Sequence, residues 1–183
     1  MRETGILSPE QEAKKEVWLK ELALFVVEAN SHTYATGGGE VSPQRPGYTE
    51  LEHQKGDWLL RDSYVGHFRA PGMTTVYFKG QPAWTMAYGG VGTQPGKYET
   101  TKESFGFLKS ALVLATPELP YRGPKKYEKD GRRYEMDVRG GLDEFDGSER
   151  IFNGDDLEFS QLFFGGIVIS RDSNRELIYP WNL

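Results

Sequence analysis

The sequence predicts an α+β fold in which a unit of one helix and three strands occurs twice. Antiparallel sheet would pack against two helices around an approximate internal two-fold axis. Three observations lead to this prediction. The 183 residues include 22 glycines and 13% aromatic residues, a composition that suits antiparallel strands joined by tight turns. Two stretches show helical spacing of apolar residues, and each precedes three strand-like runs. Landmark residues recur in the same order in both halves.

The first predicted helix begins after Ser8. Ser8 suits the N-cap, Pro9 the first helical position and Gln11 the last position of a capping box. Apolar residues follow at helical spacing, namely Trp18, Leu22, Phe25, Val26 and Ala29. Residues 31–56 are long for a structureless connection, so we expect them to carry function or a short strand. Strands are predicted at 58–65, 74–78 and 83–88, with a hairpin turn at 79–82.

The second unit follows the same plan. Residues 89–98 are rich in glycine and predict a linker, and a helix begins at Thr100 or Thr101. Its buried stripe consists of Phe105, Leu108, Leu112 and Ala115, and Pro117 and Pro120 stop it. Strands are predicted at 133–139, 149–152 and 157–164, followed by a C-terminal hairpin at 167–179.

Four landmarks support a duplication within a single domain that spans 1–183. The spacing of Gly56 to Asp62 equals that of Gly131 to Asp137. The other pairs of segments are 45–47 with 122–124, 78–80 with 152–154, and 88–90 with 164–166. The repeat halves are then about 9–90 and 100–170. Two such units would enclose a cleft along their axis, where small-molecule sites are favoured.

Composition and motifs exclude several classes of function. The net charge is −5 with scattered basic residues, so we expect no nucleic-acid partner. There is no cysteine, no apolar run of membrane-spanning length and no signal-like start, so a cytoplasmic protein without a membrane partner is expected. His32, His53 and His67 lack metal-ligand spacing, and no nucleotide or nucleophile motif occurs. We therefore expect no metal and no cofactor.

The candidate ligand-binding residues gather mainly in the first half. They are Glu28, His32, Tyr34, Arg45, Asp62, Tyr64, Trp84 and Tyr88. Strand alternation places Asp62 on the same face as apolar residues, where a buried carboxylate needs a partner. We expect Arg45 to meet Asp62 and Arg122 to meet Asp137, directly or through one shared neighbour. This repetition favours structural pairing over a ligand site, and Trp84 and Tyr88 are compatible with plain core as well as with a pocket.

Several segments resemble a bacterial and archaeal family of domains of unknown function. They are 25–29, 33–35, 45–47, 56–57, 61–64, 77–88, 122–124 and 164–166, and the resemblance covers roughly 22–170. Members of that family occur alone or C-terminal to helix-turn-helix (XRE-type) transcriptional regulators. The resemblance implies a sensor or ligand-binding role for some members and brings no established activity.

Three functions remain open at this point. A non-enzymatic small-molecule-binding module is favoured, because the architecture forms a cleft and no catalytic motif is present. The first alternative is an enzyme that uses Glu28, His32, Asp62 or Tyr64 as acid and base in the cleft between the repeats. The second is a protein-interaction or oligomerisation domain, such as a homodimer formed through the apolar segment 177–181.

Overall fold

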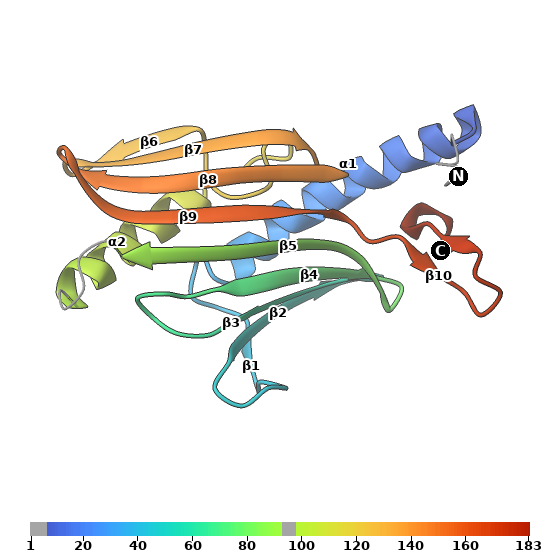
Figure 1. The fold of residues 1–183 in the computed structure, drawn as a ribbon, viewed down its shortest axis with the longest axis horizontal. Helices are drawn as coiled ribbons and strands as arrows, with labels where there is room; N and C mark the ends of the chain where they lie inside the picture. Colours follow the sequence, from blue (N-terminus) through green and yellow to red (C-terminus); the bar gives the residue numbers. More distant parts are fainter. Residues whose placement is uncertain (1–6, 93–97) are drawn as a thin grey trace.

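The computed structural model describes residues 7–92 and 98–183, which form one large antiparallel sheet, a small hairpin and two α-helices (Figure 1). In chain order the elements are α1 (Pro9–His32), β1 (Glu40–Val41), β2 (Thr49–Lys55), β3 (Trp58–Tyr64), β4 (Gly72–Phe78), β5 (Gln81–Gly92), α2 (Tyr98–Leu112), β6 (Lys126–Lys129), β7 (Arg132–Gly141), β8 (Glu144–Asn153), β9 (Asp156–Ile167), β10 (Ser170–Arg171), β11 (Leu177–Ile178) and the 3-10 helix η1 (Pro180–Asn182). The α+β class with an antiparallel sheet and two helices is confirmed.

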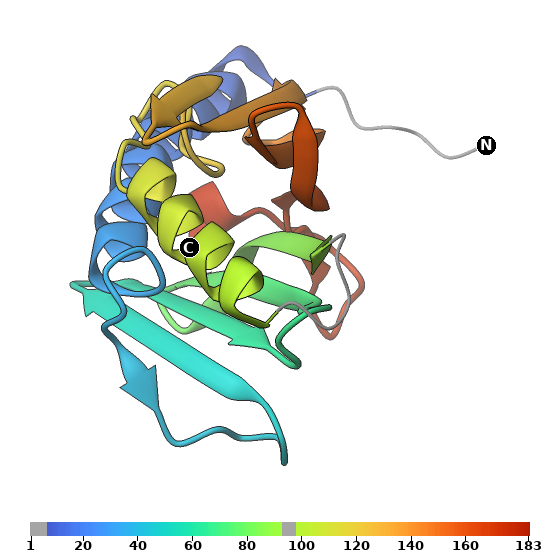
Figure 2. The same cartoon turned by 90° about the vertical axis from the view of Figure 1, so that its left-hand side faces the viewer.

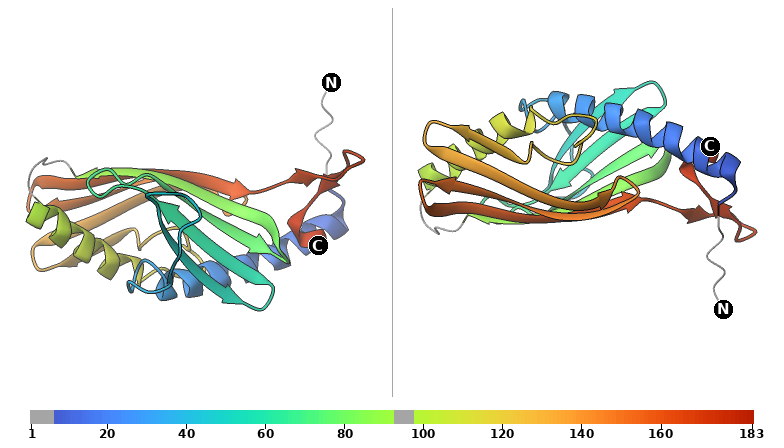
Figure 3. Two further views of the ribbon diagram at one scale, coloured as in Figure 1. Left: turned by 90° about the horizontal axis from the view of Figure 1, so that it is seen from below. Right: turned by 90° about the horizontal axis from the view of Figure 1, so that it is seen from above.

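The large sheet has the strand order β1-β2-β3-β4-β5-β9-β8-β7-β6. The two halves of the chain therefore contribute to one sheet, joined where β5 pairs with β9. Both helices lie on the same face of this sheet, which curves around them (Figures 2 and 3). Helix α1 packs on β2 and β3, and α2 packs on β7 and β9. Among the described residues, neither helix combines the length and apolar character needed to cross a membrane.

Helix α1 begins as its sequence predicts. The Ser8 hydroxyl accepts a hydrogen bond of 3.3 Å from the Gln11 amide, which satisfies one of the free donors of the first turn. The predicted apolar stripe is buried against the sheet. Trp18 in this stripe lies 5.4 Å from Trp58 and 6.4 Å from Trp181, measured between ring centroids. The C-terminal segment therefore packs on α1 of its own chain.

Several boundaries differ from the prediction. The connection 31–56 carries β1 and β2, in line with the expected short strand. Helix α2 begins at Tyr98, so the predicted cap threonines lie inside its first turn. Of the predicted linker 89–98, residues 89–92 extend β5 and residues 93–97 lie outside the described part of the chain. The strands run longer because ladder hydrogen bonds with neighbours extend them beyond their most apolar residues.

Apart from the short edge strand β1, the sheet consists of β2 to β5 from the first half and β6 to β9 from the second, and each set runs in chain order from its edge to the centre of the sheet. In each half the last hairpin has a register shift, between Val76 and Tyr77 in one and between Ile151 and Phe152 in the other. The internal duplication and its two-fold axis nevertheless remain predictions.

One landmark of the duplication was misplaced by a residue. The β2–β3 turn lies between Lys55 and Trp58, whereas the β6–β7 turn lies between Lys129 and Arg132. Counted from the turns, Asp137 is one position out of step with Asp62. A shift of one residue moves a side chain to the opposite face of a strand. The side chain of Asp137 is accordingly 79% exposed, and Arg150 Nη2 lies 3.0 Å from it.

Candidate functional site

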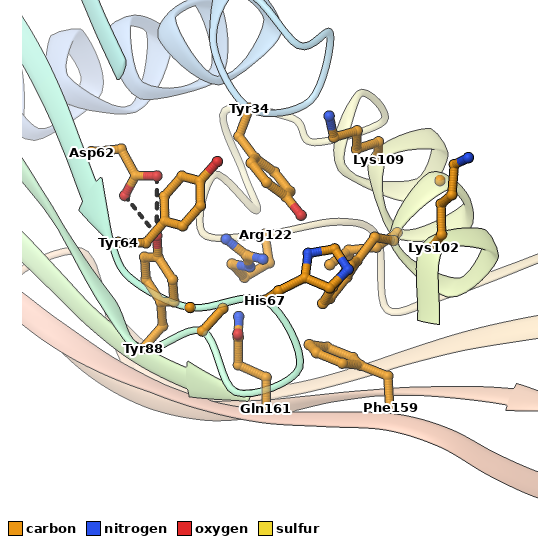
Figure 4. A pocket seen from close by; sticks show the side chains of 15 residues that line it. Tyr34, Asp62, Tyr64, His67, Tyr88, Lys102, Lys109, Arg122, Phe159 and Gln161 are labelled. Carbon is orange, nitrogen blue, oxygen red and sulfur yellow. Dashed lines mark hydrogen bonds between the residues drawn. The ribbon is translucent and has the colours of Figure 1, made fainter. Parts of the chain in front are cut away.

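A pocket of about 440 Å³ lies between α2 and the helix-covered face of the sheet (Figure 4). Side chains from both halves of the chain line it, and four of the eight predicted site residues are among them. The lining residues are Tyr34, Asp62, Tyr64, Gly66, His67, Ala70, Tyr88, Lys102, Phe105, Gly106, Leu108, Lys109, Arg122, Phe159 and Gln161.

Asp62 stands at one end of this pocket on β3. Its side chain lies on the same face of β3 as that of the buried Leu60, and the residue is only 7% exposed. Thr74, opposite on β4, donates a hydrogen bond of 2.8 Å to Oδ1. The Tyr88 hydroxyl lies 3.0 Å from both carboxylate oxygens. Burial raises the pKa of the Asp62 carboxyl, and the hydrogen bonds from Thr74 and Tyr88 offset part of that rise.

Two glycines make room for the side chains around the pocket. Gly72 pairs with Tyr88 in the sheet, and a Cβ atom at Gly72 would lie 2.5 Å from Tyr88 Cζ. At Gly90 a Cβ atom would lie 2.8 Å from Gln161 Oε1 and 2.8 Å from the Phe159 ring. Side chains at these positions would therefore push lining residues out of place.

Arg122 is held at the pocket by the buried carboxylate of Glu149, which is 0% exposed. Arg122 Nε and Nη2 lie 3.1 and 2.9 Å from Glu149 Oε1. Tyr134 Oη donates to Oε2 at 2.7 Å, and Gln161 Nε2 donates to Oε1 at 2.8 Å. Burial disfavours the charged guanidinium, but the Glu149 charge and its hydrogen bonds outweigh it and raise the pKa of Arg122.

Helix α2 presents Lys102, Phe105, Gly106 and Lys109 to the pocket, at the spacing of one helix face. Lys109 Nζ lies 4.9 Å from the centroid of the Tyr34 ring. Gly106 is an exposed member of the pocket lining, and a Cβ atom there would meet no heavy atom within 4 Å.

The tyrosines complete the polar end. Tyr34 comes from the turn after α1, and its hydroxyl points into the pocket (Figure 4). Its ring meets that of Tyr64 edge to face at 6.0 Å. Burial raises the pKa of Tyr34 to about 12, and burial also raises the pKa of Tyr64 and of Tyr88. All three phenols are therefore hydrogen-bonding groups, in their neutral form, at physiological pH.

The other four predicted residues lie elsewhere. Glu28 Oε2 is 2.5 Å from Lys55 Nζ, on the α1–β2 side of the molecule. The His32 ring stacks on that of His53 at 4.6 Å. Trp84 is fully buried in the core, where its ring stacks on Phe145 at 5.5 Å, so it does not line the pocket.

The two predicted arginine–aspartate pairs are not formed. Arg45 Nε lies 3.9 Å from Glu50 Oε1, and its guanidinium stacks over Tyr48. Asp62 is bound instead by the hydroxyls of Thr74 and Tyr88. Arg122 pairs with Glu149 and not with Asp137. In the part of the chain that the structure describes, no three histidine, aspartate or glutamate side chains are grouped as metal ligands.

The sequence analysis did not predict most of the pocket residues that come from the second half of the chain. Lys102, Phe105 and Lys109 carried a usable signal, because residues three, four and seven apart share a helix face. Gly106 inside an apolar helix stripe was a second signal, since glycine weakens a helix interior. No local pattern pointed to Gln161 or to Arg122, whose contacts with Glu149 span 12 and 27 residues of chain.

Fold and pocket together define an α+β domain whose curved antiparallel sheet and second helix enclose a pocket of aromatic, hydroxyl and basic groups. Residues 62–168 match the family described as a domain of unknown function, DUF5680, and the chain belongs to that family. The matched segment begins at Asp62 and includes Arg122 and Gln161, whereas Tyr34 lies before it. No curated protein and no solved structure matched the chain.

Proposed function

We propose that this domain is a small-molecule-binding module whose ligand occupies the pocket between α2 and the sheet. The observation that carries the proposal is the pocket of about 440 Å³, a volume in the range of ligand sites. Its lining combines apolar walls with a few convergent polar groups, as ligand sites do. Two of these groups, the buried Asp62 and Arg122 with its side chain 11% exposed, are oriented by fixed partners.

Gly106 gives independent support. A glycine in a helix interior costs roughly 0.5–1 kcal/mol relative to alanine, because the unfolded chain loses more freedom. At Gly106 the fold has space for a side chain, so packing does not require glycine there. A larger residue would instead project into the pocket.

The proposal is tested by a thermal-shift screen of a broad metabolite library, because a ligand that binds only the folded state raises its melting temperature. The screen uses wild type, Gly106→Leu, which fills the pocket, and Ala13→Leu, which adds a leucine to an exposed position of α1. We expect hits that stabilise wild type and Ala13→Leu but not Gly106→Leu. A screen without hits, or hits that stabilise Gly106→Leu equally, contradicts the proposal. The alanine variant Gly106→Ala should be more stable than wild type, which controls for helix damage.

An enzymatic role has one specific observation in its favour, the hydrogen-bonded pair of Asp62 and Tyr88, whose pKa values are both raised by burial. Glu28 and His32 lie outside the pocket, so this alternative now depends on that pair. Binding is preferred because both Asp62 oxygens already accept hydrogen bonds. Incubating screening hits with the protein and following them by NMR tests turnover. Turnover that Asp62→Asn abolishes, with binding kept, would favour the enzyme.

The other functional hypotheses have less support. Association through 177–181 is weakened because Trp181 Nε1 donates to Gln11 Oε1 of the same chain at 2.8 Å. A sensor role beside a helix-turn-helix region, and a cytoplasmic location, rest on the resemblance and the composition alone. We also propose that the two halves are duplicated units, which the mirrored strand order and the matching register shifts support.

A further inference from the structure

Arg122 has hydrogen-bonding capacity that the fold does not use. Glu149 accepts from Nε and Nη2, and the described residues supply no hydrogen-bond partner for Nη1. Its guanidinium stands in the middle of the pocket, 5.5 Å from the centroid of the Tyr88 ring (Figure 4). Arginine is suited to planar anions such as carboxylates. The donors of Nη1 are therefore available to an acceptor of a ligand in the pocket.

The remaining charges around the pocket favour an anion. Lys102 and Lys109 come from α2 and line the pocket, whereas Glu103, the neighbour of Lys102, pairs with Arg132. The acid in the lining is Asp62, whose oxygens are taken by Thr74 and Tyr88. A chain with a net charge of −5 thus has basic groups gathered around its pocket. Such a local field attracts anions.

The apolar side chains that line the pocket favour a ligand with an aromatic ring. Phe105 from α2 and Phe159 from β9 meet edge to face at 5.7 Å, and both line the pocket together with Leu108. Tyr34 and Tyr64 present a second edge-to-face pair on the other side. Aromatic rings pack well against such edges and faces.

We infer that the ligand is a compact planar organic acid, with its carboxylate at Arg122 and its ring between the aromatic walls. This inference rests on the proposed binding function and specifies the chemistry of its ligand. The two lysines of α2 attract the anion to the pocket, and Arg122 fixes the orientation of its carboxylate. The Tyr34 hydroxyl, which points into the pocket, can bind a further polar substituent (Figure 4).

The inference is tested by titration calorimetry with 2-naphthoate and with 2-naphthamide, a neutral molecule of the same shape. We expect 2-naphthoate to bind at least about tenfold more tightly, as hydrogen bonds to charged groups are the stronger ones. In the double variant Lys102→Gln/Lys109→Gln, 2-naphthoate should lose about fivefold in affinity, since charges that are open to solvent each contribute modestly. Binding of 2-naphthamide should not change. Lys20→Gln, an exposed position on α1, is the matched control and should behave as wild type.

The outcomes separate this inference from the proposed function. Equal affinity for the acid and the amide, with both lost in Gly106→Leu, overturns the inference and leaves the binding pocket in place. Binding of 2-naphthoate that Gly106→Leu does not reduce also overturns it, because the acid then binds elsewhere. If wild type binds neither probe, the inference is wrong, and the broad screen alone decides the binding function.

Discussion

Replacing Glu149 with alanine should destabilise the fold by about 3–5 kcal/mol, because the substitution leaves a buried arginine charge without its partner. Glu149 is 0% exposed and accepts hydrogen bonds from Arg122, Tyr134 and Gln161. Its loss leaves three donors in the interior without their acceptor. A domain with a typical stability of roughly 5–15 kcal/mol would remain measurably folded.

The double variant Arg122→Met/Glu149→Met should be milder than Glu149→Ala. Apolar residues of similar volume avoid the desolvation of both charges, and such replacements are often neutral or stabilising. The double-variant cycle with Arg122→Met and Glu149→Met should therefore show strong coupling between the two positions.

Urea denaturation followed by tryptophan fluorescence and by circular dichroism provides the measurement, with the slope of the transition checked for each variant. The pair of Arg139 and Asp146 is the control, because both side chains are exposed and Arg139→Ala should shift the midpoint little. If Glu149→Ala lowers the free energy of unfolding by less than about 1 kcal/mol, the reasoning is refuted. It is also refuted if the double variant loses as much free energy of unfolding as the two single variants together.

Two further predictions concern the tyrosine end of the pocket. Gly72→Ala should lower the free energy of unfolding in urea by about 1–3 kcal/mol. A Cβ atom there would lie 2.5 Å from Tyr88 Oη and would drive that hydroxyl away from Asp62. An unchanged midpoint of the transition contradicts this prediction. Burial raises the pKa of Asp62, so the folded chain keeps a proton that the unfolded chain releases, and the contribution of Asp62 to stability falls as pH rises through that interval. Asp62→Asn should therefore gain stability relative to wild type as the pH rises above about 4, the ordinary range of an aspartate pKa, and parallel stability curves would contradict the assignment.

The sequence was most informative where local chemistry decides the structure. Ser8, Pro9 and Gln11 act within one turn, so the start of α1 could be predicted from neighbours alone. Strand alternation placed Asp62 on the same strand face as apolar residues, and Asp62 lines the pocket. These inferences need no knowledge of which strands pair.

Partner assignment failed because it depends on register and on long-range pairing. Counting from Gly56 and Gly131 treated unlike turn positions as equivalent, which reversed the face of Asp137. Arg122 was then given to the wrong acid, because Glu149 comes beside it only when β7 pairs with β8. Trp84 shares a face with Tyr88 on β5, but Trp84 is buried in the core against Phe145 and does not line the pocket. Strand alternation gives the face of a side chain and not its distance from the pocket.

The pocket combines three features that work against stability. A helix-interior glycine, a buried aspartate with a raised pKa and a buried arginine–glutamate pair each cost free energy relative to apolar packing. The aspartate and the ion pair each have structural partners, but all three features converge on the same space of about 440 Å³. A chain shaped for stability alone would fill that space with apolar side chains, since interiors are close-packed. It follows that stabilising substitutions such as Gly106→Ala should gather around this pocket and weaken binding there, the trade-off expected of a functional site.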